Sequence, residues 1–371
     1  MARPFRTLAD GRRFRHTRRR MTLGAFSTHL LFALGLALLS AGAVRAMIRW
    51  PILDIPNGRS AHSVATPRGG GVGVVAAFLA GLMVLYGVAD FARLEERQFL
   101  GVILAALAIA GVALADDMRN LSARLRLLAQ LAAALVAIGT GLTLSRLALP
   151  WIGVTELGWL GPLLTVFWIL GCTNAVNFMD GLDGLVGGTL LIACVALAAI
   201  AGAEGGRFVY VAALMLAAGF AGFLPFNLHP ARIFMGDVGS QFAGFMLAVL
   251  AVAAARFDAS QISFLIVPLL LFGLLFDAAF TLLRRAWMGD RVGAPHRTHL
   301  YQMAQRSGMG TRAVAATHWG FALLQAGLAV LFLQLPPGLK PLVVLPALGL
   351  QLAWLGYVAA RVRRAGLSWR D

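Results

Sequence analysis

Long apolar runs alternate with short polar gaps along this chain. Eleven runs can be traced, most of them near the length of about 20 residues that a helix needs to cross a hydrocarbon core of about 30 Å. Their limits are 22–46, 70–89, 98–115, 125–145, 159–176, 184–202, 207–224, 240–255, 262–283, 313–333 and 341–360. The run at 240–255 is the shortest. The pattern predicts an all-α, polytopic integral membrane protein with about 11 transmembrane helices.

Composition supports a membrane protein. Of the 371 residues, 59% are hydrophobic and 13% charged, whereas soluble domains carry about 25% charged residues. We expect a basic N-terminal tail at 1–21, one multi-span domain at 22–363 and a C-terminal tail at 364–371. Since no soluble domain is predicted, nucleic acid is not an expected partner. The formal charge of +16 points instead to cytoplasmic loops, membrane lipid or a polyanionic substrate.

Polar residues gather in alternate gaps. The gaps after the first, third, fifth, seventh and ninth runs contain Asp54–Arg68, Asp116–Arg126, Asn174–Asp183, Asn227–Ser240 and Arg284–Arg312. Every second gap faces the same side of a membrane, so these segments can converge on one surface. These gaps and the C-terminus carry 18 basic residues, against 6 in the other gaps. The positive-inside rule therefore predicts that the polar face is cytoplasmic.

The first twenty residues conflict with this orientation, because they hold 8 arginines and eleven spans would place them outside the cell. Three explanations are open: a miscounted span, an unusual tail, or translation that starts at Met21, directly before the first run.

Asp116 and Asp117 follow directly on an apolar run, which predicts two adjacent carboxylates at the membrane surface. Like charges repel unless a cation or a proton offsets them, and oxygen ligands at a cytoplasmic site favour Mg²⁺. Taken alone, the pair also fits acids at a helix end that are hydrogen-bonded to Arg119 and Asn120.

Two glycine-rich gaps add further carboxylates. The segment Asn174–Gly188 sets two amides and two acids among glycines. The segment Asn227–Ser240 sets Asp237 between glycines, with the aromatic Phe234 three residues before it. Glycine lets the backbone approach a ligand, and amide side chains can form hydrogen bonds with a polar ring. A glycine-rich turn and a helix-entry acid are the structural alternatives.

Basic and imidazole side chains accompany the acids: Arg59, His62 and Arg68 in the first polar gap, and His296, Arg297 and His299 in the last. The first group precedes glycines that open a helix, where the N-terminus favours phosphate. The spacing of the two histidines allows zinc, but a third ligand is not close in the sequence, so phosphate contact fits better. Either group also fits a lipid headgroup. Acids, amides and cations on one membrane face together favour Mg²⁺-dependent phosphoryl transfer between a polyphosphate and a lipid.

Together the motifs resemble the polyprenyl-phosphate N-acetylhexosamine-1-phosphate transferases, the glycosyltransferase 4 family, over residues 50–305. The resemblance runs through five motifs in the family's order: Asp54-x-Pro-Asn57-x-Arg59-x-x-His62, Asp116-Asp117, Asn177-x-x-Asp180-Gly-x-Asp183-Gly, Phe234-Met-Gly-Asp237-x-Gly-Ser, and the His296/His299 loop. It implies transfer of a sugar 1-phosphate from a UDP-linked amino sugar to undecaprenyl phosphate, with release of UMP. The implied place is the bacterial inner membrane, with the active site facing the cytoplasm.

The resemblance also implies roles for residues. The catalytic residues would be Asp116, Asp117, Asp180, Asp183 and Asp237. The substrate-binding residues would be Asn57, Arg59, His62, Arg68, Asn177, Asn227, Phe234, His296, Arg297 and His299. Asp237 and Asp117 would hold Mg²⁺, for which Mn²⁺ can substitute, and Phe234 would stack on uracil. The sequence leaves open whether attack is direct or passes through an aspartyl-phosphate.

The last motif departs from phospho-MurNAc-pentapeptide translocase, which carries a run of histidines where this chain reads His-Arg-Thr-His-Leu-Tyr-Gln. The form is closer to enzymes that start O-antigen or capsule chains with GlcNAc or a deoxy-amino sugar. The pentapeptide transferase is the alternative within the family. The sugar, the polysaccharide pathway and the oligomeric state, a homodimer included, stay open.

Two other classes fit less well. An ion-coupled transporter would carry acids near mid-span and an internal repeat. Here the acids lie at helix ends, and neither glycine-rich motif recurs in the other half of the chain. A CDP-alcohol phosphatidyltransferase would need a dense cluster of acids along two consecutive helices, which the segment 180–188 lacks.

Overall fold

The computed structural model describes residues 23–55, 65–88, 96–149, 153–256, 262–291, 293–294 and 296–370. The predicted tail at 1–21 and the predicted substrate-binding residues Asn57, Arg59 and His62 lie outside these ranges.

The described residues form helices joined by short loops. The helices are α1 (Leu23–Arg49), α2 (Gly71–Val88), α3 (Glu96–Arg119), α4 (Ala123–Gly139), α5 (Leu160–Met179), α6 (Leu185–Glu204), α7 (Arg207–Asn227), α8 (Gly236–Arg256), α9 (Ile266–Leu270), α10 (Phe272–Trp287), α11 (Leu300–Arg306), α12 (Thr311–Gln334), the 3-10 helix η2 (Lys340–Val343) and α13 (Val344–Arg364). Two antiparallel pairs of strands complete the fold, β1 (Ile52–Asp54) with β2 (Thr66–Arg68) and β3 (Arg146–Leu149) with β4 (Gly153–Glu156).

The expected all-α membrane architecture is confirmed. In the described part of the chain, nine helices are long and apolar enough to cross a membrane. The other two predicted runs also form helices, but α4 has 17 residues and the run at 262–283 is divided into α9 and α10. Gln325 of α12 bridges this break: with its amide oriented to satisfy both groups, it donates to the Leu270 carbonyl (3.1 Å) and accepts from the Gly273 N–H (2.9 Å). The side-chain amide thus replaces helical hydrogen bonds that lipid could not supply.

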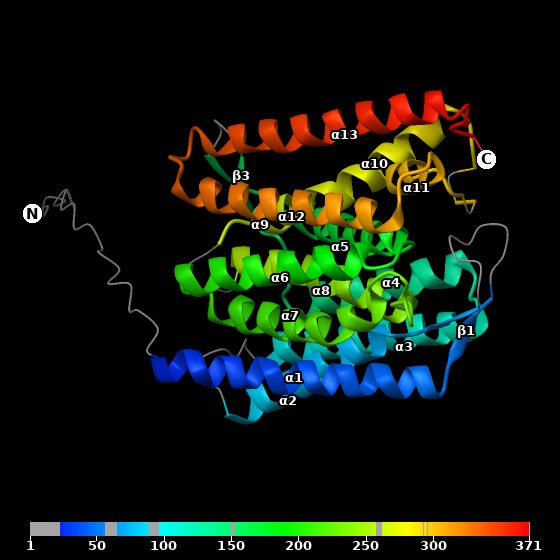
Figure 1. The fold of residues 1–371 in the computed structure, drawn as a ribbon. Helices are drawn as coiled ribbons and strands as arrows, with labels where there is room; N and C mark the ends of the chain where they lie inside the picture. Colours follow the sequence, from blue (N-terminus) through cyan, green and yellow to red (C-terminus); the bar gives the residue numbers. More distant parts are fainter. Residues whose placement is uncertain are drawn as a thin grey trace, which may run out of the picture.

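Helix α8 is the centre of the bundle. Every residue from Val238 to Ala254 is buried, and α2, α3, α5 and α7 pack around it. Its first residues, Gly236 and Asp237, are partly exposed at one end of the bundle. Figure 1 shows β1, α11 and the C-terminus at that end, and β3 with the start of α1 at the other. The predicted convergence of alternate gaps on one surface is therefore what the fold produces.

Candidate active site at the polar end of the bundle

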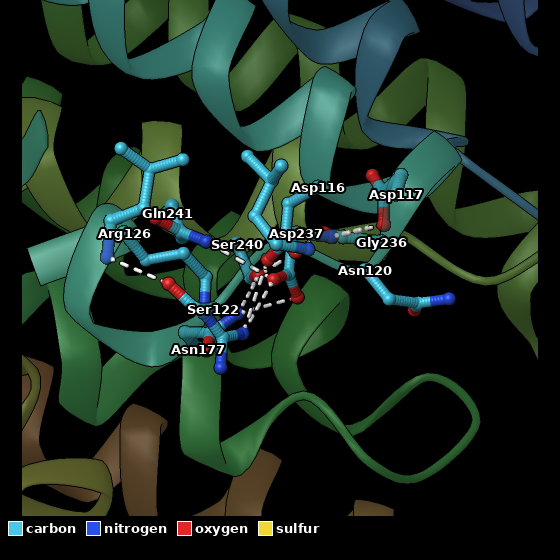
Figure 2. Close-up of polar contacts among 12 residues, drawn as sticks. Asp116, Asp117, Asn120, Ser122, Arg126, Asn177, Gly236, Asp237, Ser240 and Gln241 are labelled. Carbon is cyan, nitrogen blue, oxygen red and sulfur yellow. Dashed lines mark hydrogen bonds and ion pairs between the residues drawn. The ribbon is translucent and has the colours of Figure 1, made fainter.

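Asp237 lies at the centre of a hydrogen-bonded cluster at this end (Figure 2). Its Oδ1 accepts a hydrogen bond from Asn177 Nδ2 (2.9 Å). Its Oδ2 accepts from Arg126 Nη1 (3.2 Å) and from Gln241 Nε2 (3.1 Å). The carboxylate stays 26% exposed, so a ligand can still reach it. Helices α4, α5 and α8 thus fix the orientation of one accessible acid.

Asp117 holds the start of α8 in place. Its side chain is 2% exposed, and its Oδ1 and Oδ2 accept hydrogen bonds from the Asp237 and Val238 N–H groups, both at 3.0 Å. A carboxylate at a helix N-terminus satisfies free N–H groups and is favoured by the helix dipole. Gly236 is required beside it, because its φ is +76° and a Cβ there would lie 2.7 Å from Asp117 Oδ2. Asp117 therefore positions the backbone that carries Asp237.

Asp116, which is 5% exposed, forms a different set of contacts from its neighbour. Its Oδ1 accepts from the Leu121 N–H (2.6 Å), and its Oδ2 accepts from Arg126 Nη1 (3.1 Å). The same nitrogen contacts Asp237, so one guanidinium bridges the two carboxylates and offsets their repulsion. Arg126 lies in the first turn of α4 because Ser122 caps that helix and accepts from the Leu125 N–H. Arg126 is not among the site residues that the sequence predicted.

A chain of amides continues from Asp237 into the interior of the bundle. Gln241 Oε1 accepts from Gln130 Nε2 (3.0 Å), and Gln130 Oε1 accepts from Asn174 Nδ2 (2.6 Å). Because Gln130 donates to the Gln241 oxygen, Gln241 turns its NH₂ group toward Asp237. Both glutamines are nearly fully buried, at 2% and 3% exposure. Neither glutamine is among the predicted site residues, although a glutamine within an apolar run is the signal that could have indicated them.

The loop after α5 brings two predicted residues to the cluster. Asn177 Nδ2 donates to Ser240 Oγ (2.9 Å) as well as to Asp237. Asp180 follows at the C-terminal cap of α5. Burial, with smaller contributions from the carboxylates of Asp237 and Asp117, raises the pKa of Asp180 to about 8. In the absence of a cation, Asp180 is therefore largely protonated at neutral pH.

Asp183 and Asn227, by contrast, organise a neighbouring loop. Asp183 Oδ2 contacts His229 Nδ1 (2.7 Å) and accepts from the Ala231 N–H (3.1 Å). Asn227 accepts from the Gly184 N–H and donates to the Ile233 carbonyl, both at 3.0 Å. These contacts fix the 228–233 loop against the start of α6. Asp183 therefore anchors this loop in the structure, and its catalytic role stays a prediction.

Backbone hydrogen bonds join the entrances of α2 and α8. The N–H groups of Gly70 and Gly71 donate to the carbonyls of Phe234 (2.9 Å) and Met235 (2.8 Å), and the Phe234 N–H donates to Pro67 (2.8 Å). Arg68, next to Pro67, donates to the Asp117 carbonyl. Arg68 and Phe234 therefore lie beside the cluster, and their substrate-binding roles stay predictions.

The loop with the two histidines is fixed by a buried acid. Asp277, which is 1% exposed, accepts from the N–H groups of Leu300 (2.9 Å) and Tyr301 (3.1 Å) and contacts His299 Nδ1 (3.1 Å). Asp277 thus fixes the start of α11. The His296 ring stacks on the His299 ring at a centroid distance of 5.0 Å.

Helix α11 carries this loop onto the Asp180 loop. The Tyr301 hydroxyl donates to the Phe178 carbonyl (3.2 Å). It also packs so closely on Gly181 that a Cβ there would lie 2.3 Å from the hydroxyl oxygen. The Arg297 carbonyl accepts from Arg306 Nη1 (3.0 Å). His296, Arg297 and His299 thus border the same end of the bundle as Asp180.

The carboxylate oxygens at this site suit a hard cation that takes its remaining ligands from a substrate. Among the described residues, no group of three His, Cys, Asp or Glu side chains could by itself enclose a metal ion. Mg²⁺ is commonly held by one or two carboxylates together with substrate phosphates, so such an enclosure is not required. Asp237, the accessible carboxylate of the cluster, fits this mode of binding.

The fold and the site define a polytopic membrane protein with a carboxylate and arginine cluster at one end of its helices. Residues 99–255 match the family described as glycosyl transferase family 4. A protein of Bacillus subtilis named "Probable undecaprenyl-phosphate N-acetylglucosaminyl 1-phosphate transferase" is 32% identical over 272 residues, which cover 72% of this chain and 74% of the relative. This chain belongs to glycosyl transferase family 4.

Two further relatives differ in how much of the chain they match. The decaprenyl-phosphate N-acetylglucosaminephosphotransferase of Mycobacterium tuberculosis H37Rv is 30% identical over 300 residues, 74% of each chain. The phospho-N-acetylmuramoyl-pentapeptide-transferase of Chlamydia muridarum is 41% identical, but over 126 residues, 32% of this chain and 38% of the relative. The likeness to the two N-acetylglucosamine enzymes therefore extends over more of the chain.

Proposed function

We propose that this protein is a membrane enzyme that transfers an N-acetylhexosamine 1-phosphate from a UDP-sugar to undecaprenyl phosphate. An oxygen of the lipid phosphate attacks the phosphorus that carries the sugar. The bond from that phosphorus to the bridging oxygen breaks, and UMP leaves. The products are UMP and undecaprenyl-diphospho-sugar. One observation carries the proposal: an accessible Asp237, fixed by Arg126, Asn177 and Gln241, lies at one end of a membrane bundle whose relatives are named for this chemistry.

The contacts of each residue indicate its role in the proposed reaction. Arg126 already bridges two carboxylates, and its guanidinium can turn to the phosphates of the substrates. Asp116, freed from Arg126, accepts a proton from the lipid phosphate. Asp117 fixes the start of α8, and each of its oxygens keeps a second lone pair for a cation.

The proposal includes a Mg²⁺ ion bound at this cluster. Asp237, supported by Asp117, would hold the ion, and bound Mg²⁺ offsets charge on the diphosphate and on the departing UMP. The loop at His296, Arg297 and His299 would contact the diphosphate or the sugar, and the Asn177–Asp180 segment would line the uridine side.

The proposed setting is the bacterial inner membrane, with the polar end of the bundle facing the cytoplasm. Its support is the arginine-rich composition of the loops at that end. The proposed product begins a cell-envelope polysaccharide. The extended match to the N-acetylglucosamine enzymes favours an N-acetylglucosamine-type donor over a MurNAc-pentapeptide donor.

UMP release by the purified protein in detergent tests the proposal. The assay contains undecaprenyl phosphate, Mg²⁺ and one donor from a panel: UDP-GlcNAc, UDP-GalNAc, UDP-linked deoxy-amino sugars and UDP-MurNAc-pentapeptide. Asp237→Asn should lose turnover. Glu156→Gln is the matched control, because Glu156 is 67% exposed in the β3–β4 pair, at the opposite end of the bundle.

Turnover with an aminosugar donor that Asp237→Asn abolishes and Glu156→Gln preserves would support the proposal. Turnover with UDP-MurNAc-pentapeptide alone would select the alternative within the family. An active Asp237→Asn variant, or no UMP with any donor, would refute the proposed site or the proposed reaction.

A further inference from the structure

The C-terminal tail folds back onto the polar end of the bundle. After α13 ends at Arg364, the Leu367 N–H donates to the Val362 carbonyl (3.1 Å), and Leu367 and Trp369 pack against the hydrophobic core. Arg370 Nη2 donates to the Met288 carbonyl (3.0 Å), just beyond the end of α10. The tail is therefore fixed at both of its ends, to α13 and to α10.

Trp369 of the tail contacts Arg284 of α10. The Trp369 ring lies 4.7 Å from the Arg284 guanidinium carbon, and the Phe280 ring lies 5.9 Å from it. Both distances are within the range of cation–π attraction, which is stronger where the cation is shielded from water. Two Arg284 nitrogens are fully buried. Trp369 thus stabilises a guanidinium that is partly removed from solvent.

Arg284 in turn holds the histidine loop. Its Nη2 donates to the Thr298 carbonyl (3.0 Å), between His296 and His299 in the chain. Thr298 Oγ1 contacts His296 Nδ1 (3.1 Å) on the other side. A continuous path therefore runs from Trp369 through Arg284 to the residue between the two histidines.

A second contact joins the same elements. Arg361 of α13 donates to the Ser307 carbonyl (2.9 Å) and to Ser307 Oγ (3.2 Å), where α11 ends. The segment from Thr298 to Ser307 is thus held at its start by Arg284 and at its end by Arg361. Side chains make all of these contacts, so the placement of the loop depends on a few residues.

We propose that the C-terminal tail is a positioning element for the His296–His299 loop, and that Trp369 acts through Arg284. This inference rests on the proposed function, in which the loop contacts the donor. Trp369 does not touch a reacting atom. It lowers the fraction of time in which the loop departs from the geometry that binds the donor.

Four proteins test the proposal in the same detergent: the wild type, Trp369→Ala, Trp369→Phe and Trp287→Ala. Trp287 ends the same helix as Arg284, but it is 93% exposed, so it controls for loss of a tryptophan that only meets lipid or solvent. Hydrogen exchange is followed at the amides of Thr298–Tyr301, and KM and kcat are measured with the donor that the wild type uses.

Trp369→Ala should speed exchange at these amides about five- to tenfold, the factor expected for loss of one shielded cation–π contact. KM for the donor should rise about threefold or more, with kcat changed less than about twofold, because the loop binds ground state and transition state alike. Trp369→Phe should lie closer to the wild type, and Trp287→Ala should match it. Exchange within α8 should be the same in all four.

Unchanged exchange at Thr298–Tyr301 in Trp369→Ala would overturn the proposal, as would an equal effect of Trp287→Ala. Faster exchange with unchanged KM would overturn the claim that order in the loop serves the donor. Exchange needs no turnover. A wild type that releases no UMP would therefore refute the proposed function, while the exchange result still decides whether the tail positions the loop.

Discussion

Replacing Asp117 with asparagine separates a positioning role from a chemical one. The carboxylate accepts two backbone N–H groups of α8, both at 3.0 Å, and is 2% exposed. Asparagine offers one oxygen in place of two, so one of these N–H groups would face an NH₂ group. A hydrogen bond to a charged group contributes about 1.5–3 kcal/mol, and attraction to the helix N-terminus adds about 0.3–1 kcal/mol. We expect Asp117→Asn to lower the free energy of unfolding by about 2–4 kcal/mol.

Thermal unfolding in one detergent, beside UMP release, measures this effect. For a chain of this size, the loss corresponds to a Tm lower by about 5 °C. Asp237→Asn is the comparison, because its side chain is 26% exposed and water can replace lost partners. It should lose turnover with a much smaller change in Tm. If Asp117→Asn kept the wild-type Tm and lost only turnover, Asp117 would act in the chemistry and the positioning argument would be refuted.

Three further predictions follow from the same cluster. Gly236→Ala should cost about 2 kcal/mol or more and reduce UMP release, because a Cβ would meet Asp117 at a φ of +76°; an unchanged Tm would contradict this. Gln241→Leu should destabilise by about 1–3 kcal/mol by leaving the buried Gln130 NH₂ group unpaired. Gln130→Leu in the same chain should recover part of the loss in Tm without restoring turnover, because Asn174 loses its bond to Gln130 but keeps its bond to the Leu170 carbonyl. The pKa of Asp180 is raised from 3.8 to about 8 in the folded protein, so between these two pH values the folded form keeps a proton that the unfolded chain gives up. The stability that protonated Asp180 contributes is therefore lost as the pH rises from about 4 to about 8. In EDTA, the Tm of the wild type should therefore fall more between pH 5 and pH 8 than that of Asp180→Asn, and parallel curves would contradict the prediction.

Much of the architecture could be predicted because it depends only on the length of the apolar runs and on the alternation of the loops between the two sides of the membrane. Apolar runs of sufficient length must be helices in a bilayer, and alternate loops must share a face. Asp116, Asp117, Asn177 and Asp237 are in such alternate loops or at their edges, so the sequence alone predicts that they share one end of the bundle.

The partners of these residues could not be predicted, because they depend on the rotation of each helix about its axis. Arg126 reaches Asp237 across 111 positions of sequence, and no local spacing indicates that contact. The same holds for Asp277, which lies in the chain near Arg284 but caps α11 instead. Asp183 is a further case, because its contacts with the 228–233 loop follow from the fold and not from its position in the motif.

The backbone hydrogen bonds between the entrances of α2 and α8 divide the site into two mechanically different halves. Main-chain bonds tie Pro67–Gly71 to Phe234–Met235, so these contacts do not depend on a donor or acceptor in a side chain. The half that carries the histidines is fastened by side chains such as Asp277 and Arg284. In the proposed reaction, replacement of residues around 296–299 and in the tail would therefore change donor preference, while the half that carries Asp237 would keep its geometry. The proposed reaction centre would in this way accommodate different sugars.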